Sequence, residues 1–257
     1  MKYILITIFF LSSCASSGFS LWDSEKPDEV ELSGYKLYAE EDFINQLKSF
    51  KEIFLEENKS KLIKLNYNQK KYLKKIIESL KANNELFFKS DENPEFFIIE
   101  SEKPFHFSLP GQKFFLSTGL IRKYIKSEQI LFCVLAYELI RSEKNIYTKR
   151  VLIPTRVMSI ERILSLQRLS IKDKSEIHKW AYYVLRRTNS NTDSYLSWLQ
   201  IINRNSIDFT LQLGEIRSIS EEEAIFKAFL IENKKKQTKK YKGSSREFYN
   251  LLRVIKR

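Results

Sequence analysis

The feature that most constrains the fold is an apolar stretch in the middle of the chain, residues 127–141, which read SEQILFCVLAYELIR. Its length and composition predict a strongly apolar helix. This helix carries a carboxylate, Glu138, which would be costly to bury without a partner. The chain has the apolar mass to build a core around it, since 43% of its 257 residues are hydrophobic, and this excludes a disordered protein.

The numbers of cysteine and histidine residues bear on two further classes of protein. Two cysteines are too few for a disulfide scaffold. Two histidines, His106 and His178, leave little material for a histidine-based metal or catalytic cluster. The formal net charge of +12 comes largely from lysines spread across helix faces, which favours general solubility over one binding patch.

The first residues form a targeting segment. Met1-Lys2 is a minimal positive region, and residues 3–11 are apolar but too short to span a bilayer. Leu11-Ser12-Ser13-Cys14 then resembles the bacterial lipoprotein signal, which implies that residues 1–13 are a signal peptide and that Cys14 is lipidated. Ala15 after the cysteine implies the outer membrane, with the domain facing the periplasm. The alternative is an ordinary secretory signal with a coincidental cysteine.

The remaining pattern predicts a mostly helical α+β domain over residues 35–233, after a tether at 14–34. Strands are expected at 96–99, 105–109 and 113–117, and Pro110-Gly111 marks a hairpin between the last two. The expected sheet is small and antiparallel. A basic tail, 234–257, has six lysines between Lys234 and Lys242 and ends in an amphipathic helix. Further helices are expected at 35–62, 68–80, 157–169, 175–187, 195–202, 221–232 and 245–255.

Two blocks carry a family resemblance. Residues 107–121 read FSLPGQKFFLSTGLI and precede the apolar helix. Together they resemble the HtpX-like zinc endopeptidases, gluzincins related to the prenyl-protein protease and to periplasmic proteases that guard the outer membrane. The resemblance covers roughly residues 35–232, is specific over 107–141, and implies a zincin-like fold with a small sheet packed on the active-site helix. The matching positions are Phe107, Leu109, Pro110, Gly111, Gly119, Leu120, Glu128, Val134, Leu135, Ala136 and Glu138.

The same resemblance implies that the metal ligands are lost. Tyr137 and Arg141 stand where the family has two histidines one helical turn apart, and Lys174 stands at the third, acidic ligand. His178 replaces an acidic residue that supports the site, and only the general base survives, as Glu138. A divalent cation cannot be held by Tyr, Arg and Lys, so no cofactor is expected; zinc would be expected only if the enzyme were active.

Charge suggests another role for the remaining carboxylate. Arg141 lies three residues after Glu138 on the same helix face, and Lys174 would arrive from a facing helix. We expect these two cations to neutralise Glu138 in a structural ion pair, although a retained catalytic role is the alternative. We expect His106 to be a satisfied or partly exposed side chain and Cys133 to be an inert core thiol, in preference to a metal ligand and a nucleophile.

These expectations combine into a membrane-tethered periplasmic lipoprotein whose metallopeptidase-like domain no longer hydrolyses peptides. It would bind an envelope protein or peptide, with no nucleic acid as a partner. A strand beside the active-site helix could bind an extended peptide by β-augmentation. The alternatives are an active metalloendopeptidase with an atypical site and a protein that binds anionic lipid through its basic tail. The candidate peptide-binding strand comprises Lys113, Phe114, Phe115, Leu116 and Ser117.

Overall fold

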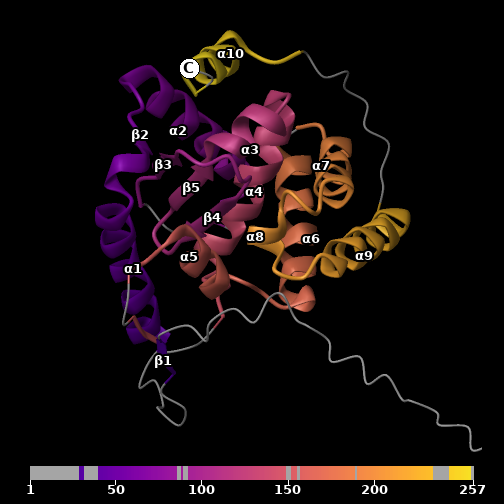
Figure 1. The fold of residues 1–257 in the computed structure, drawn as a ribbon. Helices are drawn as coiled ribbons and strands as arrows, with labels where there is room; N and C mark the ends of the chain where they lie inside the picture. Colours follow the sequence, from indigo (N-terminus) through magenta and orange to yellow (C-terminus); the bar gives the residue numbers. More distant parts are fainter. Residues whose placement is uncertain are drawn as a thin grey trace, which may run out of the picture.

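The fold is seen in a computed structural model that describes residues 29–31, 40–85, 88, 92–148, 152–154, 157–188, 190–233 and 243–255 (Figure 1). Cys14 and the run from Lys234 to Lys242 lie outside these residues. In chain order the elements are β1 (Glu29–Glu31), α1 (Glu40–Glu57), η1 (Lys59–Lys61), β2 (Leu62–Ile63), α2 (Tyr67–Lys81), β3 (Glu95–Ile99), β4 (His106–Leu109), β5 (Lys113–Ser117), α3 (Thr118–Lys123), α4 (Glu128–Glu143), β6 (Leu152–Pro154), α5 (Ile160–Leu166), α6 (Ile171–Arg187), α7 (Asp193–Arg204), α8 (Thr210–Leu213), α9 (Arg217–Asn233) and α10 (Arg246–Ile255).

The main sheet has four strands in the order β2-β3-β5-β4. β4 and β5 form the predicted hairpin, with Phe107 opposite Phe115, and Gly111 in the turn has a positive φ of 81°. β5 then runs parallel to β3, so the sheet is mixed and the expectation of an antiparallel sheet was wrong. The reason is that the chain crosses from β3 to the far edge before the hairpin returns it beside β3. β1 and β6 form a separate antiparallel pair.

Helices cover both faces of this sheet. Apolar side chains of α1 and α5 form one cluster with alternate residues of β4 and β5, among them Phe107 and Phe115. Phe54 of α1 packs edge-on against both rings, at centroid distances of 5.6 and 5.5 Å. The opposite face, with Phe114 and Leu116, packs in a larger cluster with α2, α4 and α6.

Helix α4 is the centre of the larger cluster, as its apolar sequence predicted. It contacts β4, α2, α6 and α7, and its side chains are buried along nearly its whole length. The Ser127 hydroxyl caps its start by accepting a hydrogen bond from the Ile130 N–H. Among the described residues, no helix combines the length and apolarity needed to cross a bilayer.

The other predicted helices are present, with shifted ends. α1 buries Phe43, Leu47, Phe50 and Phe54, which the 3.6-residue period of a helix places on one face. α9 begins at Arg217, four residues before the predicted start. The acidic residues 221–223 therefore lie in its second turn, where Glu222 pairs with Lys174 and Glu223 with Lys227.

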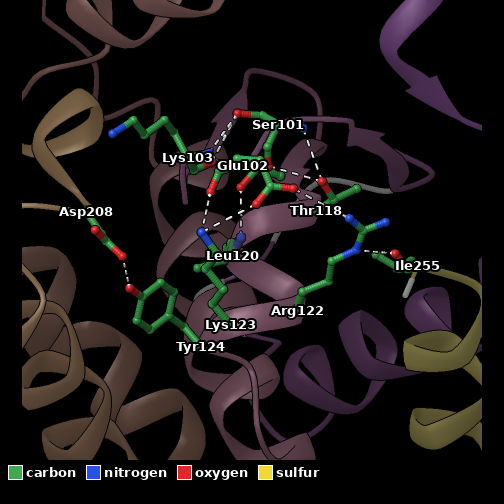
Figure 2. A network of polar contacts seen from close by, with 11 residues as sticks. Ser101, Glu102, Lys103, Thr118, Leu120, Arg122, Lys123, Tyr124, Asp208 and Ile255 are labelled. Atoms are coloured by element: carbon green, nitrogen blue, oxygen red, sulfur yellow. Dashed lines mark hydrogen bonds and ion pairs between the residues drawn. The ribbon is translucent and has the colours of Figure 1, made fainter. Parts of the chain in front are cut away.

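The short helix α3 is tied to the loop after β3 (Figure 2). The Gly119 N–H donates to the Ser101 carbonyl at 2.7 Å, and a Cβ at Gly119 would lie 2.3 Å from the Glu102 carbonyl oxygen. Only glycine fits this approach, which gives a structural reason for the residue. Arg122 of α3 also donates through Nε to the Ile255 carbonyl at 2.6 Å, and so holds the end of α10 (Figure 2).

Helix α10 packs on the domain through its apolar face. Phe248, Leu251, Leu252 and Ile255 are buried in the larger cluster, against α2 and α3. At its start the Ser245 hydroxyl and N–H donate to the buried Glu128 carboxylate at 2.7 and 2.9 Å. The apolar face of this predicted amphipathic helix is therefore not available to lipid, and only the lysine run remains for the lipid-surface hypothesis.

Candidate functional site

Glu138 lies in the middle of α4 and faces strand β4. Its side chain is only 1% exposed. The Nδ1 atom of His106 lies 2.5 Å from one carboxylate oxygen, and the Ser108 hydroxyl donates to the other at 2.7 Å. Because side chains alternate along a strand, His106 and Ser108 point to α4 while Phe105 and Phe107 point to α1. Both oxygens of the carboxylate are thus engaged by one strand.

Gln212 of α8 fixes the protonation of the His106 ring. Its Oε1 accepts a hydrogen bond from the His106 backbone N–H at 3.0 Å, which places its NH2 group 3.0 Å from His106 Nε2. An amide NH2 can only donate, so Nε2 accepts and Nδ1 carries the proton that is donated to Glu138. His106 is therefore a fully satisfied buried histidine, as predicted, and Gln212 is a partner that the sequence did not reveal.

Electrostatics keep Glu138 ionised. Burial alone raises the pKa of its carboxyl, but the hydrogen bond from His106, the nearby Arg141 charge and the Ser108 hydroxyl outweigh burial, and the pKa lies below its usual value. An ionised carboxylate that already accepts two hydrogen bonds is a structural acceptor. It is poorly placed to take a proton from water.

Arg141 is also buried, with 4% exposure, but it does not contact Glu138 directly. Its guanidinium donates to the Gln167 carbonyl and lies over the Tyr147 ring, 5.2 Å from the centroid. Its Nε makes no hydrogen bond within the described part of the chain. The sequence therefore placed Arg141 beside Glu138 correctly, as a nearby charge, but was wrong in making it an ion-pair partner.

Lys174 has a different partner from the expected one. Its ammonium lies 2.8 Å from Oε1 of Glu222, on α9, and His178 Nε2 lies 3.2 Å from Oε2 of the same carboxylate. His178 Nδ1 in turn lies 3.0 Å from the Tyr195 hydroxyl. Burial raises the pKa of Glu222, but His178 and Lys174 lower it by more, so the pKa lies below its usual value. His178 thus belongs to a buried polar cluster with Glu222 and Tyr195, while Glu176 pairs with Lys179 on the surface.

A single cavity lies between these clusters. It is lined by Tyr137, Arg141, Lys174 and His178, which the resemblance had grouped from two separate segments of the sequence. The Tyr137 ring stands between the two histidines, with centroid distances of 5.9 Å to His106 and 5.1 Å to His178. The volume open to a water-sized sphere is about 50 Å³. Glu138 is absent from this lining, since it faces β4.

The residues at this cavity do not fit a zinc ion. Burial raises the pKa of Tyr137 well above its usual range, so its hydroxyl stays protonated. Arg141 and Lys174 offer only N–H donors and repel a cation. Within the described residues, no group of three or more His, Cys, Asp and Glu side chains is arranged to hold a metal ion.

The expected peptide-binding strand is not an edge strand. Lys113, Phe114, Phe115, Leu116 and Ser117 form β5, which pairs with β3 on one side and β4 on the other. Its backbone groups are already used by the sheet, so it cannot add a peptide by β-augmentation. β4 is the edge strand beside α4, and Gln212 bonds the His106 N–H on its outer side.

Cys133 lies in the apolar interior of α4 with no exposed surface. Burial raises the pKa of its thiol, so the thiolate is disfavoured. This agrees with the expectation of an inert core thiol.

Comparison with known proteins adds no relative. No protein-family model matches the chain. A search of curated proteins also finds no match.

Proposed function

We propose that this chain is a non-catalytic binding protein of the bacterial cell envelope, built on a metallopeptidase-like domain that has lost its metal ligands. The observation that carries the proposal is the state of the surviving carboxylate. Glu138 is buried, does not line the cavity, and has both oxygens bonded, one to His106 and one to Ser108. A general base must reach the proton that it removes, directly or through one water.

The positions that the resemblance assigns to metal ligands support the same proposal. Tyr137, Arg141 and Lys174 line one cavity. The three replacements of family ligands therefore change one and the same site. Each now presents hydrogen-bond donors in place of the lone pairs that a cation needs. The arrangement therefore favours the binding of a ligand that accepts hydrogen bonds over metal-assisted hydrolysis.

The location in the envelope rests on the N-terminal sequence. Leu11-Ser12-Ser13-Cys14 follows a short apolar run, and acylation of Cys14 would tether the domain to a membrane. Incorporation of radiolabelled palmitate into the chain, expressed in a bacterium that acylates lipoproteins, tests this. The wild-type chain should be labelled and Cys14→Ala should not; a wild-type chain without label contradicts the tether.

Catalysis is tested by a casein cleavage assay on the full-length chain, with and without a chelator. We expect no cleavage above the background of a mock preparation. The alternative, an active metalloendopeptidase with an atypical site, requires cleavage that the chelator abolishes. The mock preparation is the control for contaminants: cleavage that it lacks, that the full-length chain shows and that the chelator abolishes would overturn the proposal.

A further inference from the structure

Arg141 is a buried cation whose donors are largely unused. It is 4% exposed, it donates a hydrogen bond to the Gln167 carbonyl, and its Nε makes no hydrogen bond inside the described part of the protein. Guanidinium does not lose its proton, so it cannot become neutral when buried. Buried charges in proteins are normally paired. Here no carboxylate of the described residues lies within ion-pair distance of Arg141, because Glu138 bonds His106 and Ser108, and Glu222 bonds Lys174 and His178.

The cavity beside Arg141 collects other donors. The Tyr137 hydroxyl stays protonated and makes no hydrogen bond with any residue that the structure describes. Lys174 bonds Glu222 with one of three N–H groups. The lining has three cationic side chains, Arg141, Arg168 and Lys174, against the carboxylate of Glu222. The cavity is thus electropositive and rich in donors.

The size of the cavity and its other lining residues narrow the class of ligand that could bind. About 50 Å³ open to a water-sized sphere admits a group of a few heavy atoms. The lining also includes apolar side chains, among them Leu164, Leu169 and Trp198. Gln167, another lining residue, has a buried Oε1 that makes no hydrogen bond within the described residues. Turned into the cavity, this oxygen would accept a hydrogen bond from an N–H or O–H next to the anionic group.

We propose that this cavity binds a carboxylate group, held by Arg141 and the Tyr137 hydroxyl, on a ligand that carries an amide N–H beside it. The chemistry is that of the C-terminal end of a peptide or of a free N-acylated amino acid. Arg141 would pair in the planar, two-bond geometry that guanidinium and carboxylate share. The inference deepens the proposed function, on which it rests, by naming the ligand class of the same site.

Calorimetric titration of the full-length chain, in a buffer without organic acids, tests this. The probes are N-acetylglycine, its carboxamide, acetate and inorganic phosphate. We expect N-acetylglycine to bind, acetate to bind more weakly, and the carboxamide not to bind. Equal binding of acid and carboxamide, tighter binding of phosphate, or no binding of any probe overturns the proposal. A short peptide with a free C-terminus, compared with the free N-acylated amino acid, separates the two sources.

Two variants assign the site. Arg141→Gln should weaken N-acetylglycine binding at least tenfold, and Tyr137→Phe, which keeps the ring and removes only the hydroxyl, should weaken it several-fold. Arg186→Gln is the control, because Arg186 lies over the Tyr183 ring outside the cavity. Binding unchanged in Tyr137→Phe and Arg141→Gln would contradict the assignment. If Arg141→Gln fails to fold, Tyr137→Phe decides alone. Casein cleavage bears on the proposed function and is independent of these titrations.

Discussion

His106 Nδ1 and Glu138 Oε1 lie 2.5 Å apart, and this contact joins the edge strand β4 to the middle of the buried helix α4. Each member of the pair has a further hydrogen bond: Gln212 bonds the imidazole, and Ser108 bonds the carboxylate. The carboxylate that the resemblance identifies as a former general base is therefore a structural link between sheet and helix.

Removal of this carboxylate should destabilise the domain. Glu138→Ala leaves the His106 Nδ1–H without an acceptor in a closed site and leaves the Ser108 hydroxyl only the backbone carbonyl of residue 138. We expect a loss of about 3–5 kcal/mol in the free energy of unfolding. Urea denaturation measures it. The exposed Glu176, which pairs with Lys179 on the surface, provides the control, and Glu176→Ala should change the stability by less than about 0.5 kcal/mol. An unchanged Glu138→Ala variant would show that the link is not structural.

Acid should weaken the fold through the two buried carboxylates. Glu138 and Glu222 have pKa values below the usual one in the folded state, so below about pH 4.5 the unfolded chain binds more protons than the folded chain. Their contribution is present above that pH and is lost as the pH falls through the folded-state values. Urea midpoints from about pH 6 to about pH 3 should fall, and the fall should be shallower in Glu138→Gln. An equal pH dependence in both proteins would contradict this.

Restored ligands should restore zinc binding if the resemblance is correct. The triple variant Tyr137→His, Arg141→His, Lys174→Glu supplies two imidazoles and a carboxylate at one cavity. It also brings a carboxylate close to Glu222, so the variant should be less stable until zinc is added. We expect a rise in melting temperature with zinc, and none in the wild-type chain. A triple variant that folds but whose melting temperature does not change with zinc would show that these positions do not correspond to metal ligands.

Two neighbouring aromatic residues test the packing of α10. Phe248 is fully buried, while Tyr249 is 55% exposed. Phe248→Ala should cost about 3–5 kcal/mol of unfolding free energy and Tyr249→Ala little, since only the first leaves a cavity in the core. Thermal unfolding compares them. Similar melting temperatures would mean that α10 is not docked on α2 and α3.

The lysine run allows a separate test of lipid binding. Replacement of its six lysines by glutamine leaves α10 intact, whereas truncation after Asn233 would expose the core that α10 covers. Under the lipid-surface hypothesis, wild-type protein should bind vesicles with anionic headgroups at low salt and the glutamine variant should not. Equal binding of the two proteins would remove this hypothesis.

The helices and the turn, which depend on residues close together in the chain, could be predicted from the sequence. The apolar face of α1, the buried helix α4 and the turn at Pro110-Gly111 were all correct, because spacing and turn residues act over a few positions. The parallel pairing of β3 with β5 was missed because it depends on the path of the chain between them. The resemblance also grouped Tyr137, Arg141 and Lys174, which do line one cavity.

The partners of the charged residues were the harder part. The contact of Glu138 with His106 spans 32 positions, and that of Lys174 with Glu222 spans 48. Neither pair has a helical spacing, whereas the i+3 spacing of Arg141 suggested a contact that the side chain does not make. Buried charges need partners, but the packing of the helices and strands decides which partner is in reach.

The central claim is that donors have replaced the metal ligands in the cavity at Tyr137, Arg141 and Lys174. The most direct test is the zinc content of the full-length chain, measured by elemental analysis after incubation with excess zinc and removal of unbound metal by gel filtration. The account predicts far less than one zinc per chain. One zinc per chain, retained through gel filtration and lost on addition of a chelator, would contradict it.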